Sequence, residues 1–256
     1  MPEWLQAGFW GLLAGSALLA GAAHGYLVRL TERQIAGVMA FGSGVLISAL
    51  SIELLDEAFA MGGFDSTAIG FIGGAIIYTT AVWYPNRRGA LLRKHHGINT
   101  PSQPTEEEQD GSGTAIAVGA LIDGIPESIA IGVSMIAGGA VSVVTVVAIF
   151  ISNIPEGLSS SVGMKNSGRT PGYIFLVWAS IAAASGAAAL AGYSVFSQFS
   201  AGITVVALAV AAGGMMTMIA GTMIPVAFHD AHESGNFIGL VTAAGFLTSY
   251  VISQLD

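Results

Sequence analysis

Long apolar runs separated by short polar segments dominate the pattern of this chain. An α-helix needs about 20 consecutive, mostly apolar residues to cross the hydrocarbon of a bilayer. Eight runs of roughly this kind lie at residues 4–28, 34–58, 66–84, 113–136, 139–164, 171–193, 201–227 and 236–254. The pattern predicts an all-α polytopic membrane protein with eight transmembrane helices in one domain spanning residues 1–256.

One polar segment is much longer than the others. Residues 85–112, between the predicted third and fourth spans, hold His95, His96 and the acidic run 106–108. Low hydrophobicity together with proline is typical of disordered segments. We therefore predict a flexible cytoplasmic loop, whose two histidines act either as part of a solvated tether or as a loose collector of metal.

Composition supports the membrane interpretation. Apolar residues make up 53% of the chain and charged residues 9%, whereas a soluble domain carries about 25% charged residues. The chain has no cysteine, which excludes disulfides, thiolate metal sites and cysteine nucleophiles. No basic patch suggests nucleic acid, so the predicted partner is the lipid bilayer.

The basic residues predict the orientation. They all lie in segments that follow the predicted first, third and fifth spans. They are Arg29, Arg33, Arg87, Arg88, Arg93, Lys94, Lys165 and Arg169. Loops rich in lysine and arginine stay in the cytoplasm, so we expect both termini outside it, in an inner or plasma membrane.

One short phrase occurs twice inside the predicted spans. Residues 122–128 read Ile-Asp-Gly-Ile-Pro-Glu-Ser, and residues 151–157 read Ile-Ser-Asn-Ile-Pro-Glu-Gly. Each proline leaves the carbonyl four residues earlier without its helical donor, so that oxygen can face a polar ligand. A carboxylate at the bilayer centre costs about 2.5 to 3.5 kcal/mol on insertion scales. Two such phrases in consecutive spans therefore indicate a functional site more than a pair of structural kinks.

The polar residues of the two phrases predict a cation site. Asp123 lies one helical turn before Glu127 on the same helix face, and Ser152 and Asn153 precede Glu156 in the second copy. If the two helices are antiparallel neighbours, three carboxylates and an amide meet in one dry place. The predicted metal ligands are Asp123, Glu127, Glu156 and Asn153.

Three further residues are weaker candidates for contact with the cation. Glu53 lies one turn deeper than Asp56 and Glu57 near the predicted outer interface, where it could guard an ion entrance. His229 and His232 belong to a dense polar segment that follows the seventh predicted span. That segment is either a hydrated loop or a site that receives ions as they leave.

Taken together, these residues resemble the Zrt/Irt-like (ZIP) family of metal transporters. The resemblance covers nearly the whole chain, including the eight predicted spans, the polar loop and both Pro-Glu phrases. Members of that family read His-Asn-x-Pro-Glu-Gly in the fourth span and a similar Pro-Glu-Gly phrase in the fifth. The resemblance implies a ZIP-like bundle in which Asp123, Glu127 and Glu156 occupy the positions of the primary metal site.

The chain departs from the family pattern where a second metal would bind. The corresponding positions are Gly124, Asn153 and Ser185, which carry no charge. Thr222 and Glu53 also replace residue types that the family usually has, a glutamate and a histidine respectively. A second cation would lack the negative charge that offsets repulsion between the ions, so we predict a single central metal.

The resemblance also implies the activity. Family members move divalent metal into the cytoplasm by alternating access, with a block of spans one, four, five and six moving against the other four. The expected substrate is zinc, iron, manganese or cadmium, and no organic cofactor or enzymatic activity is expected. An all-oxygen ligand set is harder than one with imidazole, which favours manganese and ferrous iron relative to zinc.

Two other functions fit the same carboxylates. An intramembrane metal-dependent hydrolase would use a carboxylate-bound metal to activate water, although the predicted spans hold no cluster of histidines. A transporter of protons or of an organic cation would need no metal. The sequence leaves the oligomeric state open, with a homodimer among the alternatives.

The single-metal prediction can be tested by crystallography. A metal-soaked crystal is expected to show one strong anomalous peak among Asp123, Glu127 and Glu156. Two strong peaks about 4 Å apart, the spacing of bridged two-metal sites, would contradict it.

Overall fold

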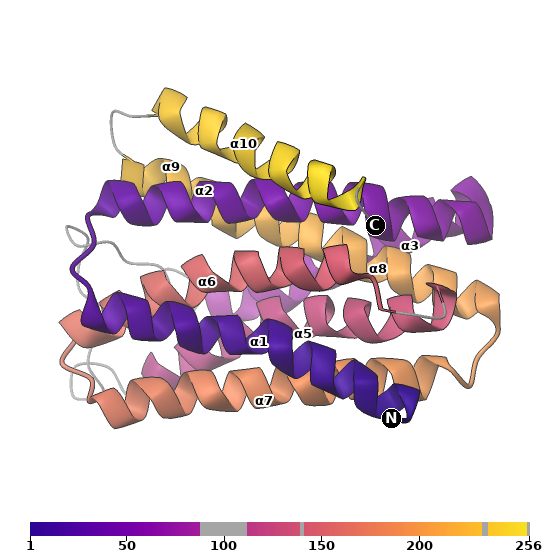
Figure 1. Ribbon diagram of the computed structural model, residues 1–256, viewed down its shortest axis with the longest axis horizontal. Helices are drawn as coiled ribbons and strands as arrows, with labels where there is room; N and C mark the ends of the chain where they lie inside the picture. The colour runs from indigo at the N-terminus through magenta and orange to yellow at the C-terminus, as the bar shows by residue number, and fades with distance from the viewer. Residues whose placement is uncertain (88–111, 139–140, 232–234, 255–256) are drawn as a thin grey trace.

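A computed structural model describes residues 1–87, 112–138, 141–231 and 235–254 of the chain, and these residues form a bundle of helices without strands (Figure 1). The helices in chain order are α1 (Glu3–Leu27), α2 (Glu32–Ala49), α3 (Leu55–Arg87), α5 (Ser112–Gly138), α6 (Val143–Asn166), α7 (Pro171–Phe196), α8 (Ala201–Met218), α9 (Ile224–Ala231) and α10 (Gly235–Ser253). Two π-helical turns, η1 (Leu50–Leu54) and η2 (Ile219–Met223), join α2 to α3 and α8 to α9. The predicted loop 85–112 lies almost entirely outside the described residues.

The predicted all-α membrane architecture is confirmed. Six of the described helical stretches are long and apolar enough to cross a membrane, and Phe237–Ser253 is a shorter apolar helix. This is the composition of a multi-pass membrane protein. The count of eight spans stays a prediction.

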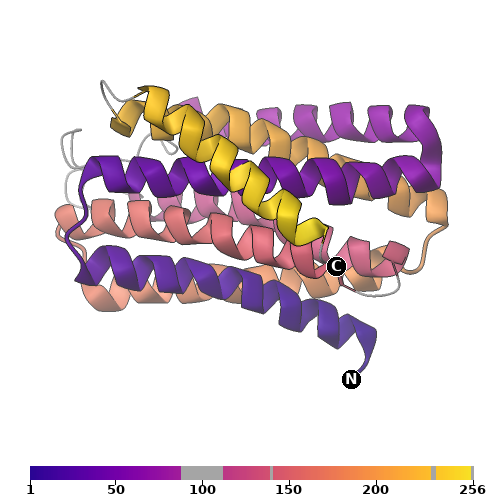
Figure 2. The same ribbon diagram turned by 45° about the horizontal axis from the view of Figure 1, so that its top comes forward.

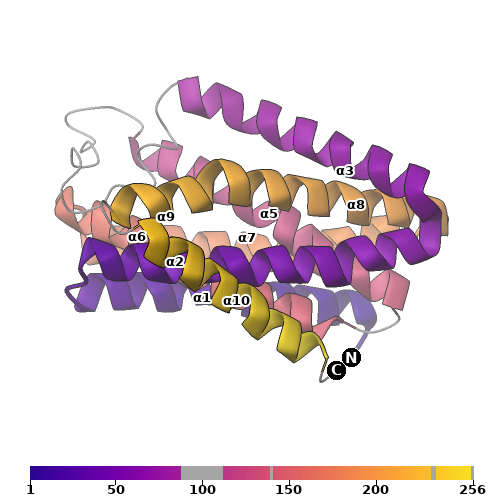
Figure 3. The ribbon, with the colours of Figure 1, turned by 90° about the horizontal axis from the view of Figure 1, so that it is seen from above.

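The longest apolar stretch, Glu32–Trp83, turns back on itself. Gly63 has φ 69° and ψ −176° there, and no atom comes within 4 Å of the place where a Cβ would sit. A positive φ favours glycine because glycine has no Cβ to clash with the backbone. Figure 3 shows α3 running back from this turn, so the predicted spans 34–58 and 66–84 lie on either side of it.

Close crossings at glycine hold α3 against α8. A Cβ added to Gly74 would lie 1.9 Å from the Val210 carbonyl oxygen, and one added to Gly213 would lie 1.9 Å from the Phe71 carbonyl oxygen. The two backbones therefore touch at two places where a larger side chain does not fit. Small residues allow this close packing between membrane helices.

The helix that carries the second Pro-Glu phrase packs against α1 in the same way. A Cβ added to Gly157 would lie 2.1 Å from the Leu18 carbonyl oxygen, and one added to Gly21 would lie 2.1 Å from the Ile154 carbonyl oxygen. The phrase thus supplies packing as well as charge.

Equally close contacts sort the helices into two groups. Gly132 packs against the Ala189 carbonyl oxygen and joins α5 to α7. Gly44 and Gly245 join α2 to α10, which crosses α2 in Figure 2. We call α1, α5, α6 and α7 the Pro-Glu group, and α2, η1, α3, α8, η2, α9 and α10 the flanking group.

The two groups approach each other less closely at the described glycines. A Cβ added to Gly42 of α2 would lie 3.2 Å from Cγ of Pro155, and one added to Gly214 of α8 would lie 3.8 Å from Cβ of Pro126. Each proline of the repeated phrase therefore faces a glycine of the flanking group. The same Cβ at Gly42 would lie 3.3 Å from the Cα atom of Ser152, so α2 also packs near the backbone of α6, at a wider separation than the closest glycine contacts within each group.

The ends of the bundle differ in charge. Both chain termini lie toward one end, and the turn between α1 and α2 lies at the other (Figure 1). At that second end the Lys165 amino group donates a hydrogen bond to the Tyr26 carbonyl oxygen over 2.6 Å and lies 4.9 Å from the centre of the Tyr26 ring. This arrangement fits the predicted orientation, which stays a prediction.

The packing at Gly74 can be tested against its neighbour. Gly74→Ala is expected to lower the free energy of unfolding by about 1 to 3 kcal/mol, because the added methyl group overlaps the backbone of α8. Gly73→Ala, where no atom lies within 4 Å, is expected to leave stability unchanged or to raise it by up to about 1 kcal/mol. Unfolding in mixed detergent micelles measures both values, and equal losses would contradict the close crossing.

Candidate metal centre

The acidic residues of the two phrases are buried inside the bundle. Asp123 and Glu127 on α5 are each 2% exposed, and Glu156 on α6 is 8% exposed. Their carboxyl groups lie on apolar membrane-type helices, where little water is at hand to solvate them. The protein itself, or an ion, must therefore supply the polar contacts.

Tyr78 provides one of these contacts, and the sequence analysis did not identify it. This residue lies on α3 in the flanking group and is 5% exposed. Its hydroxyl donates a hydrogen bond to Oδ1 of Asp123 over 2.5 Å, and the bond is buried. A buried tyrosine usually has a hydrogen-bond partner for its hydroxyl. A tyrosine within a predicted membrane span, such as Tyr78, is therefore a candidate partner for a buried carboxyl group.

Two further residues act on the same hydroxyl. The Thr222 side chain forms a hydrogen bond with Tyr78, and the Glu156 carboxyl group acts on Tyr78 electrostatically. Asp123 and Glu156 come from different helices, and the charge of each acts on Tyr78.

Thr222 lies in the π-helical turn η2, where the helix is wider than an α-helix. In η2 the Ile224 N–H bonds to the Ile219 carbonyl oxygen five residues earlier, as in a π-helix. Pro225 follows directly and has no N–H to continue the α-helical ladder. Single π-helical turns of this kind often lie at functional sites.

The carboxyl groups do not form a ready-made cluster. Within the part of the chain that the structure describes, no three His, Asp or Glu side chains are gathered closely enough to hold a metal ion. The structure therefore buries Asp123, Glu127 and Glu156 in the same interior without closing them around a common centre.

Asn153 has a structural contact of its own. Its Nδ2 atom donates a hydrogen bond to the Ala14 carbonyl oxygen on α1 over 3.1 Å. The amide nitrogen thus ties α6 to α1, and its carbonyl oxygen is the atom suited to a cation. The sequence analysis predicted the ligand role and missed this tie.

The positions of the supposed second metal contain packing contacts. A Cβ added to Gly124 would lie 3.7 Å from Oγ of Ser185, and one added to Gly15 would lie 2.9 Å from Cβ of Ser185. Asn153 contacts α1 at the adjacent residue, Ala14. These uncharged groups meet at one level of α1, and the single central metal stays a prediction.

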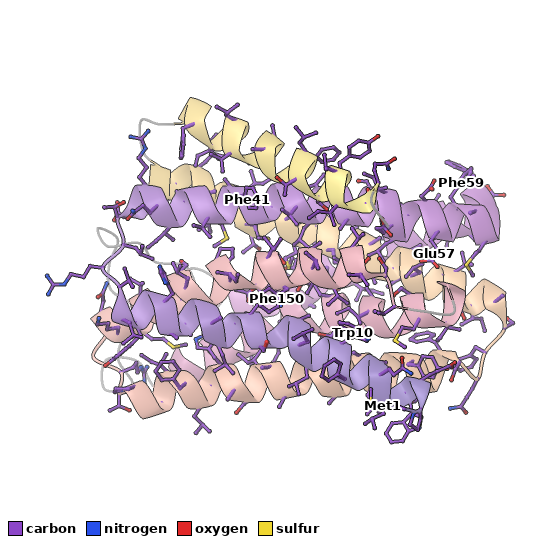
Figure 4. The ribbon with its side chains drawn as sticks, in the orientation of Figure 1. Met1, Trp10, Phe41, Glu57, Phe59 and Phe150 are labelled. Atoms are coloured by element: carbon purple, nitrogen blue, oxygen red, sulfur yellow. The ribbon has the colours of Figure 1, made fainter. Side chains whose placement is uncertain are left out.

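Glu53 lies far from the other predicted ligands. Ser142, the N-cap of α6, donates a hydrogen bond from Oγ to Oε2 of Glu53 over 3.1 Å. A carboxylate is favourable at a helix N-terminus, where the helix dipole is positive. At 1.5 Å per residue, this contact is about 20 Å along α6 from Glu156. Glu57, one helical turn after Glu53 in sequence, lies toward the same end of the bundle as Met1 (Figure 4).

The predicted exit site can be described only in part. His229 is an exposed residue near the end of α9. His232 lies outside the described residues, as does the rest of the polar segment up to residue 234. A role for the two histidines stays a prediction.

Neither the protein-family models nor the curated proteins compared with this chain give a match. The fold and its buried side chains define the chain as a multi-pass helical membrane protein with acidic residues in its interior. The resemblance to the ZIP family therefore stays a prediction from the sequence.

The tie between α6 and α1 predicts a stability effect. Asn153→Ala is expected to lower the free energy of unfolding by about 1 to 3 kcal/mol, because it removes a buried hydrogen bond and leaves a cavity. Asn166→Ala, at an exposed position on the same helix, should change it by no more than about 0.5 kcal/mol. Thermal unfolding of the purified protein compares the two, and equal effects would exclude a stabilising tie.

Proposed function

We propose that this protein transports divalent metal cations into the cytoplasm through one central, carboxylate-rich site. The observation that carries the proposal is the burial of Asp123, Glu127 and Glu156 in apolar helices. Each carboxylate in a membrane interior is costly, and such residues mark ion pathways and proton relays. The ZIP resemblance of the two phrases supports metal as the cargo.

The chemistry of the surroundings favours hard or borderline cations. The Asp123 carboxyl group is hydrogen-bonded to the Tyr78 hydroxyl, and Thr222 forms a hydrogen bond with the same hydroxyl. Oxygen-rich sites suit manganese, and zinc and ferrous iron also accept carboxylate ligands. We therefore propose manganese, iron or zinc as substrates, with cadmium as an additional ion suggested by the family resemblance.

The arrangement of the helices supports alternating access. The closest glycine contacts lie within each group, whereas Gly42 and Gly214 meet the other group at 3.2 to 3.8 Å. A boundary with wider contacts is suited to movement of one group relative to the other. Asp123 of the Pro-Glu group accepts a hydrogen bond from Tyr78 of the flanking group across this boundary.

The orientation follows from the charge at the two ends. We propose an inner or plasma membrane protein with both termini outside the cytoplasm. The common end of the termini supports this orientation, as do Arg29 and Arg169 in loops of the opposite end and Lys165 in the last turn of α6.

Uptake into liposomes tests the transport proposal. In protein reconstituted into liposomes, Glu127→Gln combined with Glu156→Gln is expected to reduce radiolabelled manganese or zinc uptake at least tenfold. The amides keep the size of the side chains and remove the charge that attracts the cation. Asp65→Asn, at an exposed position on α3, serves as the matched control and should retain uptake.

Full uptake by the double variant would overturn the assignment of these residues. Metal-independent proton or organic-cation flux that depends on Glu127 would favour the second transport alternative. Cleavage of a lipid or peptide substrate by the metal-loaded protein, without uptake, would favour the hydrolase.

A further inference from the structure

We propose that the hydrogen bond between Tyr78 and Asp123 is a latch that holds the two helix groups together when the site is empty, and that a bound cation releases it. This inference rests on the proposed metal transport and adds a regulatory residue to that site. The latch couples occupancy of the site to the freedom of the groups to move.

The hydrogen bond between Tyr78 and Asp123 crosses the boundary between the two helix groups. Tyr78 belongs to α3 of the flanking group, and Asp123 belongs to α5 of the Pro-Glu group. A second hydrogen bond, from Ser142 at the start of α6 to Glu53 of η1, crosses the same boundary and is only partly buried. The bond between Tyr78 and Asp123 is buried, so a displacement that separates α3 from α5 at this point breaks a bond that water does not readily replace.

The strength of the bond also supports the latch. It is buried, and it joins a hydroxyl donor to a carboxyl acceptor. Hydrogen bonds to charged groups in such places change an equilibrium by about tenfold to a hundredfold. At Gly42 the nearest atoms of the other group are Cγ of Pro155 at 3.2 Å and Cα of Ser152 at 3.3 Å from an added Cβ, wider than the approaches of about 2 Å within the groups. A single buried bond can therefore shift the balance between conformations.

A bound cation and the Tyr78 hydroxyl would compete for Oδ1 of Asp123. The Tyr78 hydroxyl occupies one lone pair of Oδ1, so a cation that binds Asp123 through this lone pair displaces the hydroxyl. The described acidic side chains are not gathered around a common centre in this conformation.

Calorimetry with the metal alone tests the competition. Tyr78→Phe keeps the ring and removes the hydroxyl, so the Kd for zinc or manganese is expected to fall about tenfold. In an Asp123→Asn background, Tyr78→Phe should change the Kd much less, because the charged partner is absent. Tyr250→Phe, at an exposed position on α10, is the matched control and should leave the Kd unchanged.

A distance measurement tests the mechanical part of the latch. The chain has no cysteine, so Ala60→Cys on α3 and Ser197→Cys at the end of α7 provide two unique spin-label sites, one in each group. Electron spin resonance should give one distance distribution without metal and a shifted one with zinc. The Tyr78→Phe protein is expected to show part of the shifted distribution without any metal.

The outcomes separate the latch from the proposed function. Absence of both metal binding and a metal-dependent shift in the unmodified protein would overturn the transport proposal, and the latch with it. Metal binding that depends on Glu127 and Glu156, together with unchanged affinity and unchanged distances in Tyr78→Phe, would overturn the latch alone. Weaker metal binding in Tyr78→Phe would also overturn it, because Tyr78 would then assemble the site.

Discussion

Negative charge inside an apolar bundle is the constraint on which the rest of this structure depends. Asp123, Glu127 and Glu156 are buried on helices with the composition of membrane spans. Water is not at hand to solvate them, so protein groups must contribute polar contacts. Tyr78 of the flanking group donates such a contact to Asp123, and Thr222 forms a hydrogen bond with Tyr78. The buried carboxyl group therefore joins one helix group to the other.

The packing of the helices follows a second rule, which separates tight contacts from loose ones. Glycines bring backbones together within each group, as at Gly74 against α8 and at Gly157 against α1. Between the groups, Pro126 and Pro155 face Gly214 and Gly42 at wider separations. The prolines thus have two effects, because they free carbonyl groups in their own helices and present smooth surfaces to the other group. The acidic residues beside them lie close to this boundary.

The departures from the ZIP pattern also have a physical interpretation. Gly124 and Ser185 face each other, and Asn153 bonds to the backbone of α1. Positions that carry ligands in the family pattern are used here for packing, with little charge. A lower negative charge weakens the attraction for a second cation. It also reduces the number of acidic groups that the interior must accommodate without metal.

The sequence by itself determined the positions of the helices, because the length of an apolar run and the placement of basic residues are local properties. It also marked Asp123, Glu127 and Glu156, since charges within apolar runs are visible without a fold. Only the tertiary structure decided that Tyr78 meets Asp123, 45 residues away in sequence, and that Glu53 caps α6 far from Glu156. The sequence also did not reveal which helices pack together in the two groups. Hydropathy shows which residues avoid water, but it does not show which helix faces meet, because that depends on close contacts at glycine between residues far apart in the sequence.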